Sequence, residues 1–87
     1  MRVEFSRKAV KDYSKAPLAI QHKVRYWTLE VEALGIKVAR LKPGWKDHQL
    51  IGKRKGQRSV YLNKAWRLIH VEETYEIIII EIHKHNY

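Results

Sequence analysis

Residues 66–83 read WRLIHVEETYEIIIIEIH, and this stretch decides the fold. It contains two runs rich in β-forming residues, 66–72 and 76–83, separated by the polar segment 73–75. Short apolar runs on either side of a turn are typical of neighbouring antiparallel strands. The isoleucines at 77–80 indicate a central strand that is covered on both faces. The stretch therefore predicts two paired strands in the middle of a sheet.

The chain before this stretch supplies two more strands. Residues 57–63 are also rich in β-formers, and Lys64-Ala65 is a short hairpin connection from them to Trp66. At the start of the chain, Arg2 to Phe5 alternates between polar and apolar side chains, which predicts a further short strand. The sheet is therefore expected to contain residues from both ends of the sequence.

Two helices are predicted between the first strand and the others. Ser6 is a favourable N-cap for a helix over residues 7–14, and Pro17 ends that helix or starts the next. The second helix has an apolar stripe at spacings of three and four residues, and Gly35 follows its end. We expect the stripe to pack in the core, because few other residues can build one. The apolar side of the first helix consists of Ala9, Val10 and Tyr13, and the stripe consists of Ile20, Val24, Trp27, Val31 and Leu34.

The predicted order of elements is β-α-α-β-β-β in a single domain, residues 1–87. The simplest solution is an α+β fold, with two helices packed on one face of a mostly antiparallel sheet. The sequence contains no cysteine, which excludes disulfides and thiolate chemistry. Residues 1–10 lack the apolar region of a signal peptide, and the longest apolar run, 77–80, is too short to cross a bilayer. We therefore expect a cytoplasmic protein with no membrane partner.

The positive charge of the chain lies in one continuous stretch. The formal net charge is +9, and residues 37–67 contain ten basic residues against one acid, Asp47. The rest of the chain contains eight basic and eight acidic residues, which cancel. Such segregation favours an anionic partner such as RNA, with fast and salt-sensitive association. The alternative interpretation is a solvated basic surface without a partner.

Histidines and arginines near this stretch match the chemistry of metal-free RNA cleavage. The ribose 2′-OH must lose a proton, the leaving 5′-oxygen must gain one, and the charged phosphorane must be stabilised. Histidine suits both proton transfers, and arginine binds phosphate through its planar fork. His48 lies in a loop before the basic turn 53–55, and His85 follows the last strand. Many RNA-binding modules contain the same residue types, so a binding module is an open alternative.

The other histidines have simpler interpretations. His22 lies on the polar side of the second helix and is expected to be solvated, and His70 alternates with Trp66 and Leu68 as a sheet-face residue. His83 and His85 could form a metal pair, but a catalytic zinc needs about three protein ligands. Neither a phosphate-binding loop nor a dinucleotide-binding glycine motif is present. The sequence therefore predicts neither a metal nor an organic cofactor.

Three segments in order resemble one known family. Residues 47–52, DHQLIG, look like the DHxLxG segment of the YafQ-like branch of the RelE/ParE toxin superfamily. Residues 58–69, RSVYLNKAWRLI, are similar to the R-x-x-x-L-N-x-x-W-R-L-I run of RelE- and HigB-like members. Residues 81–87, EIHKHNY, resemble the C-terminal E-[IV]-x-x-H-[DN]-Y. The two-helix layout also fits, so the resemblance covers nearly the whole chain and implies a RelE-like fold.

The resemblance implies a toxin of a type II toxin–antitoxin system. Such toxins usually enter the ribosomal A site, cleave mRNA by attack of the 2′-OH, and need no metal or organic cofactor. A cognate antitoxin is implied as a partner, and that antitoxin would provide the only link to DNA. Two alternatives remain: a ParE-like toxin that poisons DNA gyrase without nuclease activity, and a non-catalytic RNA-binding module.

The resemblance also implies residue roles. His48 and His85 match histidines of the YafQ-like branch, Arg58 and Arg67 match arginines of the second motif, and Tyr87 matches the terminal aromatic residue. We expect His85 as the general acid, His48 as the base or its positioner, and both arginines on the phosphate. The expected RNA-binding residues are Lys53, Arg54, Lys55, Tyr61 and Lys64.

Two positions depart from the family pattern. Tyr61 stands where the YafQ-like pattern has a histidine, and Ala65 stands where it has an acid. The assignment of acid and base among His48, His85 and Tyr87 is therefore left open.

Overall fold

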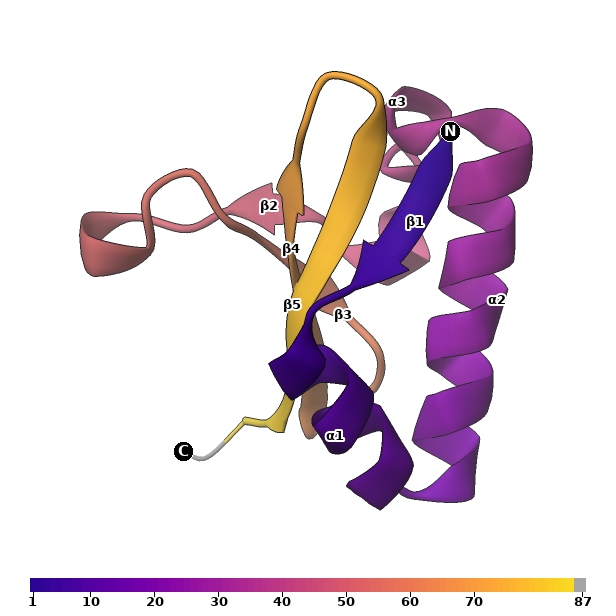
Figure 1. The fold of residues 1–87 in the computed structure, drawn as a ribbon, viewed down its shortest axis with the longest axis vertical. Coiled ribbons are helices and arrows are strands. Elements are labelled where there is room, and N and C mark those ends of the chain that lie inside the picture. The colour runs from indigo at the N-terminus through magenta and orange to yellow at the C-terminus, as the bar shows by residue number, and fades with distance from the viewer. Residues whose placement is uncertain (86–87) are drawn as a thin grey trace.

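The computed structural model describes residues 1–85 and contains a five-stranded mixed sheet with helices on one face (Figure 1). The strand order is β1-β5-β4-β3-β2; β1 pairs with β5 in parallel and the other pairs are antiparallel. The predicted α+β fold with a mostly antiparallel sheet is confirmed. The elements are β1 Arg2–Phe5, α1 Arg7–Lys15, α2 Leu18–Leu34, α3 Ile36–Ala39, the 3₁₀ helix η1 Pro43–Trp45, β2 His48–Gln49, the 3₁₀ helix η2 Gly52–Arg54, β3 Arg58–Tyr61, β4 Trp66–Glu72 and β5 Glu76–Lys84.

Helix α1 is tied to the edge of β5 by two polar side chains. The Ser6 hydroxyl accepts a hydrogen bond from the Ala9 N–H, 3.0 Å away, and donates one to the Ile80 carbonyl, also 3.0 Å away. The Asp12 carboxylate accepts from the Ile82 N–H at 3.0 Å. Because β1 pairs only with the first half of β5, α1 satisfies and covers the strand edge beyond that pairing.

The core lies between the helices and one face of the sheet. Four members of the predicted α2 stripe are buried. Within residues 1–85, no helix is long and apolar enough to cross a membrane. Each large apolar side chain buried in this way contributes about 1.5–3 kcal/mol. The sheet contributes Val60, Leu62, Leu68, Ile77, Ile79 and Ile82 to the core.

Two apolar residues that the sequence analysis singled out on the helices are exposed. Leu34 is 47% exposed, because α2 ends there and Gly35 redirects the chain with a φ of +84°, a conformation that favours glycine. Val10 is 55% exposed and lines a shallow groove with Phe5 and Leu29 rather than filling the core. The prediction that Leu34 packs in the core is wrong, and of the apolar side of the first helix only Ala9 is fully buried.

Strand β5 is central as predicted, but only its helix-facing side is fully covered. Ile77 and Ile79 are completely buried, whereas Ile78 and Ile80 are half-buried. A β-bulge between Ile69 and His70 of β4 shifts the register against β5. The isoleucine run is therefore only partly covered on its second face, because the α-helices within residues 1–85 pack on the other face (Figure 1).

The connections between the predicted elements differ from the sequence prediction. Strand β2, helix α3 and the two 3₁₀ helices were not predicted, because each spans at most four residues and shows no clear period. Strand β3 ends at Tyr61 instead of Asn63. The Asn63 side chain accepts hydrogen bonds from the N–H groups of Ala65 and Trp66, at 2.8 and 2.9 Å, and closes the β3–β4 connection.

Candidate functional site

The sheet presents a second face, which points away from α2. Residues that pair directly across neighbouring strands project to the same side of a sheet. Leu68 and His70 of β4 are buried toward the helices, so Arg67 and Ile69 project to the other side. We call this side the open face. The strand register adds these residues to it: His48 of β2, Ser59 and Tyr61 of β3, and Glu81 and His83 of β5.

Arg67 lies on the central strand β4, near the β3–β4 connection, and its guanidinium is held on the open face. Its Nη1 donates hydrogen bonds to the carbonyls of Asn63 at 2.7 Å and Trp66 at 3.0 Å. These acceptors are uncharged, so they hold the guanidinium in place without neutralising it. The guanidinium carbon also lies 4.7 Å from the centre of the Tyr61 ring, and the Lys46 ammonium lies 4.6 Å from it. Two cations therefore converge on one aromatic ring.

His48 is held in one orientation by its own loop. Its Nδ1 lies 2.8 Å from the Lys46 carbonyl oxygen, which can only accept a hydrogen bond. Nδ1 therefore carries the proton, and in the neutral ring Nε2 has a free lone pair. Because His48 is exposed on the open face, this nitrogen is able to accept a proton from a bound substrate.

Asp47, the residue before His48, has a completely buried side chain. Its Oδ1 accepts a hydrogen bond from Arg58 Nε at 2.6 Å, and its Oδ2 lies 3.4 Å from His70 Nε2. Burial alone would raise the pKa of the Asp47 carboxyl, but the hydrogen bonds from His70 and Arg58 hold the pKa below its ordinary value. This carboxylate therefore ties the segment that carries His48 to strands β3 and β4.

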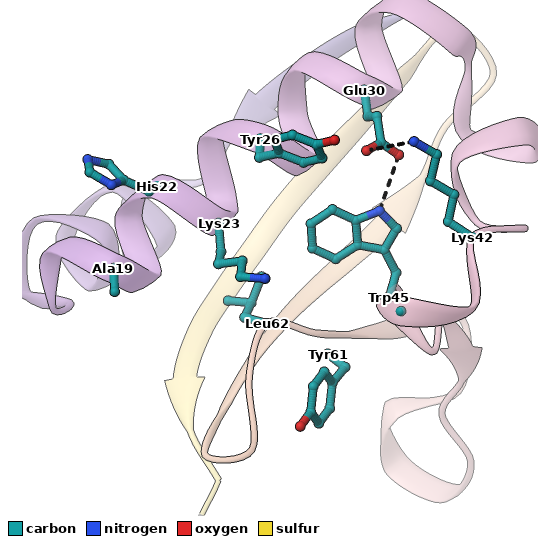
Figure 2. Close-up of a pocket in the computed structure, with 10 residues that line it drawn as sticks. Ala19, His22, Lys23, Tyr26, Glu30, Lys42, Trp45, Tyr61 and Leu62 are labelled. Carbon is teal, nitrogen blue, oxygen red and sulfur yellow. Dashed lines mark hydrogen bonds and ion pairs between the residues drawn. The ribbon is translucent and has the colours of Figure 1, made fainter.

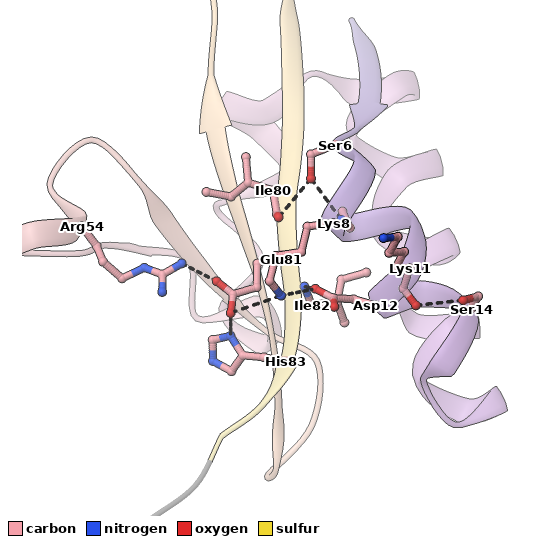
Figure 3. Close-up of polar contacts among 11 residues, drawn as sticks. Ser6, Lys8, Lys11, Asp12, Ser14, Arg54, Ile80, Glu81, Ile82 and His83 are labelled. Atoms are coloured by element: carbon pink, nitrogen blue, oxygen red, sulfur yellow. Dashed lines mark hydrogen bonds and ion pairs between the residues drawn. The ribbon is translucent and has the colours of Figure 1, made fainter.

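A second charge cluster, around Glu81, holds the basic loop of residues 52–56 against the sheet (Figure 3). Arg54 Nη2 donates to Glu81 Oε1 at 2.5 Å, and His83 Nδ1 lies 3.2 Å from Glu81 Oε2. Partial burial would raise the pKa of the Glu81 carboxyl, but the hydrogen bond and charge of Arg54 lower it below the ordinary value. Lys53 and Lys55 of the same loop stay exposed.

Sequence reasoning missed the function of two acids at this site. Asp47 appeared only as one letter of a motif and Glu81 only as a possible neighbour of a metal. Their partners, Arg58 and Arg54, lie 11 and 27 positions away along the chain, so no local pattern pairs them. The available signal was that Asp47 is the single acid among the ten basic residues of the stretch 37–67.

The predicted site residues fall into three groups. The open face brings together His48, Arg67 and Tyr61, with Arg54 reaching over it. Arg58 is not among them, because it pairs in register with His70, on the helix-facing side, and its side chain is only 14% exposed. Tyr87 lies outside the described residues, so its role stays a prediction.

His85 continues the line of open-face positions on β5. Its backbone N–H donates to the Ala65 carbonyl at 2.5 Å, one position beyond the Lys84–Trp66 pair. It is exposed and follows His83 by two residues, the spacing at which strand side chains return to the same face. Lys64 lies in the adjoining β3–β4 connection. Among residues 1–85, no three His, Asp or Glu side chains are grouped closely enough to hold a metal ion.

The strand order and the packing of the helices on one face are shared with solved structures of RelE-like toxins. The chain matches the crystal structure of YafQ from E. coli strain BL21(DE3) with a TM-score of 0.75 at 22% identity, over 97% of this chain and 93% of that chain. It matches the YoeB dimer from Staphylococcus aureus with a TM-score of 0.74 at 21% identity, over 100% and 98% of the two chains.

A third similar structure is the toxin–antitoxin complex RelBE2 from Mycobacterium tuberculosis, with a TM-score of 0.71 at 18% identity over 98% of this chain and 96% of that chain. Neither a protein-family model nor a curated protein matches the sequence. The chain has the fold of the RelE/YafQ/YoeB toxin superfamily, and the resemblance seen in the sequence motifs is confirmed at the level of the fold.

The Asp47 cluster generates a stability prediction. Replacing Asp47 by Asn should lower the free energy of unfolding by about 1.5–3 kcal/mol near neutral pH, the range for hydrogen bonds to charged groups. Because the folded-state pKa lies below the ordinary value of 3.8, the carboxylate stabilises the protein above that pH and loses its effect as the pH falls through the folded-state pKa. Urea unfolding of wild type and Asp47→Asn at neutral and acid pH measures both effects.

The control for this prediction is Glu73→Gln, which removes a carboxylate from the exposed β4–β5 turn. That variant should unfold like the wild type. The assigned ion pair would be contradicted if Asp47→Asn and the wild type had the same free energy of unfolding at neutral pH. It would also be contradicted if the difference between them were as large in acid as at neutral pH.

Proposed function

We propose that this protein is the toxin of a type II toxin–antitoxin system, and that it cleaves mRNA on the ribosome without a metal ion. The observation that carries the proposal is the guanidinium of Arg67, which forms no ion pair with an acid among residues 1–85, on a face that also holds His48 and the strand leading to His85. The fold shared with YafQ and YoeB supports the same function.

In the proposed reaction, a phosphate of the mRNA lies over Arg67 and forms charge-assisted hydrogen bonds with its guanidinium. His48 Nε2 takes the proton of the adjacent 2′-OH, and the 2′-oxygen forms a bond to phosphorus. The bond from phosphorus to the 5′-oxygen breaks, and His85 gives that oxygen a proton. The products are a 2′,3′-cyclic phosphate and a free 5′-OH.

The positions of the two histidines constrain how the RNA binds. His48 lies on β2 and His85 follows β5, three strand spacings apart, which amounts to about 14 Å across a flat sheet. His48 is in register with Glu81, so His85 also lies four residues further along the strand direction, which adds an offset of about 13 Å. The imidazoles therefore act from opposite sides of a substrate that lies over Arg67, and they do not contact each other directly.

Arg58 has a different role in this proposal from the phosphate contact expected from the sequence. Its guanidinium contacts the Asp47 carboxylate and lies 3.6 Å from Glu72. Arg58 and Asp47 together fix the backbone that leads into His48. Arg58 is therefore a positioning residue, and Arg67 is the arginine that contacts the phosphate.

The proposed partners follow from charge and from the similar structures. The exposed Lys53 and Lys55, with Lys64, would contact mRNA and ribosomal RNA in the A site. RelBE2 and the YoeB–YefM complex from Staphylococcus aureus are assemblies of toxin and antitoxin. We infer that a cognate antitoxin covers the open face of this chain, and that contact with DNA occurs only through that antitoxin.

Replacing His85 by Ala should abolish growth arrest and slow mRNA cleavage on purified ribosomes by about 10²- to 10⁴-fold, the usual contribution of one acid–base group. Binding to ribosomes should be largely unchanged, because the phosphate contacts remain. The matched control is Lys84→Ala, which removes an exposed cation from the neighbouring position, paired with Trp66. This control should cleave like the wild type.

If His85→Ala is fully toxic and cleaves at the wild-type rate, the proposed mechanism is wrong. Growth arrest with inhibited DNA gyrase and intact mRNA would favour the ParE-like alternative.

The basic loop generates a prediction about salt dependence. Replacing Lys53 and Lys55 together by Ala should weaken RNA binding and make its dependence on salt shallower, by about 0.7 in log–log slope for each phosphate that is no longer neutralised. Arg54 is left in place, because its pairing with Glu81 holds the loop. The control removes the same charge from exposed positions of α1, Lys11 and Lys15. Equal slopes for the two double variants would exclude the loop from the RNA-binding surface.

A further inference from the structure

A cavity of about 660 Å³ lies between α2 and the segment formed by η1 and the end of β3 (Figure 2). None of the proposed catalytic groups lines this cavity, but Tyr61 lies both in the cavity wall and on the open face. Tyr61 lines the cavity and also lies under the Arg67 guanidinium on the open face. An RNA strand that crosses Arg67 therefore reaches the mouth of this cavity by passing over Tyr61.

The cavity has an accessible aromatic wall. The ring of Tyr26 lies 6.0 Å from that of Trp45, with the planes tilted by 44°, and Tyr26 is 59% exposed. Trp45 Nε1 donates to Glu30 Oε1 at 3.2 Å, which fixes the indole. Tyr26 therefore offers an open ring surface beside an indole that cannot swing away.

The rim of the cavity is positively charged. The Glu30 carboxylate is compensated by the Lys42 ammonium at 3.1 Å. Lys23 lines the cavity from α2, and Lys46 contacts Tyr61 where the cavity meets the open face. An aromatic wall with a cationic rim is the combination that holds an unpaired base by stacking and its phosphate by charge.

A protein segment fits this cavity less well. An amphipathic helix docks through apolar anchors at i, i+3, i+4 and i+7, and therefore needs an extended apolar groove. Here the apolar lining consists of the aromatic residues, Leu62 and Ala19, and it is interrupted by the charged or polar side chains of His22, Lys23, Glu30 and Lys42. The shape and the charge both favour one planar anionic ligand, such as a nucleotide.

We propose that the cavity binds an unpaired nucleobase of the RNA substrate, stacked on Tyr26, beside the phosphate that lies over Arg67. The inference rests on the proposed function, because that function places single-stranded RNA on the open face. It adds a base-binding subsite that lies on the α2 side of Tyr61.

The test is the binding of a single-stranded RNA of about 12 nucleotides whose sugars are all 2′-O-methylated, so that 2′-OH attack is impossible. Fluorescence anisotropy should show about 5- to 100-fold weaker binding by Tyr26→Leu, the effect of removing one stacking ring. Tyr26→Trp should bind like the wild type. The matched control Tyr75→Leu removes an 86% exposed tyrosine from the β4–β5 turn and should also bind like the wild type.

A second measurement locates the stacked base. In a series of the same RNA with one abasic position at a time, one position should weaken wild-type binding but have no further effect on Tyr26→Leu. Equal affinity of wild type and Tyr26→Leu for the intact RNA would overturn the inference. A dependence on Tyr26 that appears only with poly-glutamate, and not with RNA, would also overturn it and show a protein-docking surface.

These results are independent of catalysis. Base binding that depends on Tyr26, in a protein that does not cleave mRNA, would reject the proposed function and keep the subsite. Cleavage without any dependence of binding on Tyr26 would reject the subsite and keep the function.

Discussion

The alternation of side chains along β4 and β5 is the constraint on which the rest of the structure depends. Leu68, Ile77 and Ile79 project toward the helices and build the core. The intervening positions, such as Arg67, project away from it. Because the helices occupy one face only, the second face is available for charged and imidazole side chains. The same pairing that stabilises the fold therefore sets the spacing of the candidate catalytic groups.

The buried Asp47 carboxylate gives different environments to Arg58 and Arg67, two arginines that look equivalent in the sequence. Arg58 is paired with it on the helix-facing side, so its charge is compensated and its side chain is nearly inaccessible. Arg67 is held by uncharged backbone carbonyls, and we propose that it contacts the phosphate of the substrate. Glu81 has a comparable effect on the basic loop, where it pairs with Arg54 and leaves the two neighbouring lysines exposed. The electrostatic field at the open face thus depends on which cations form ion pairs with acids of the protein.

Local patterns predicted most of the fold but little of the site geometry. The limits of β1 and β4 were predicted correctly, and those of α1 and β5 to within one residue, because their periodicity and turn residues act locally. Strand β2 was missed because two residues carry no period. Placing Arg58 on the helix side needed the register of β3, and finding the Arg54–Glu81 pair needed the tertiary fold. Tyr26 was not singled out, since one exposed aromatic residue on a helix has no signal of its own until Trp45 packs beside it.

The most direct test of the proposed mechanism is cleavage of an mRNA with a single 2′-deoxynucleotide at the cleaved position, on ribosomes that present this codon in the A site. We expect wild-type protein to cleave the all-ribose mRNA and to leave a 2′,3′-cyclic phosphate. The 2′-deoxy mRNA should stay intact at that position while it is still bound. Cleavage of both mRNAs at the same rate, or products that end in a 3′-OH and a 5′-phosphate, would contradict attack by the 2′-OH on the open face.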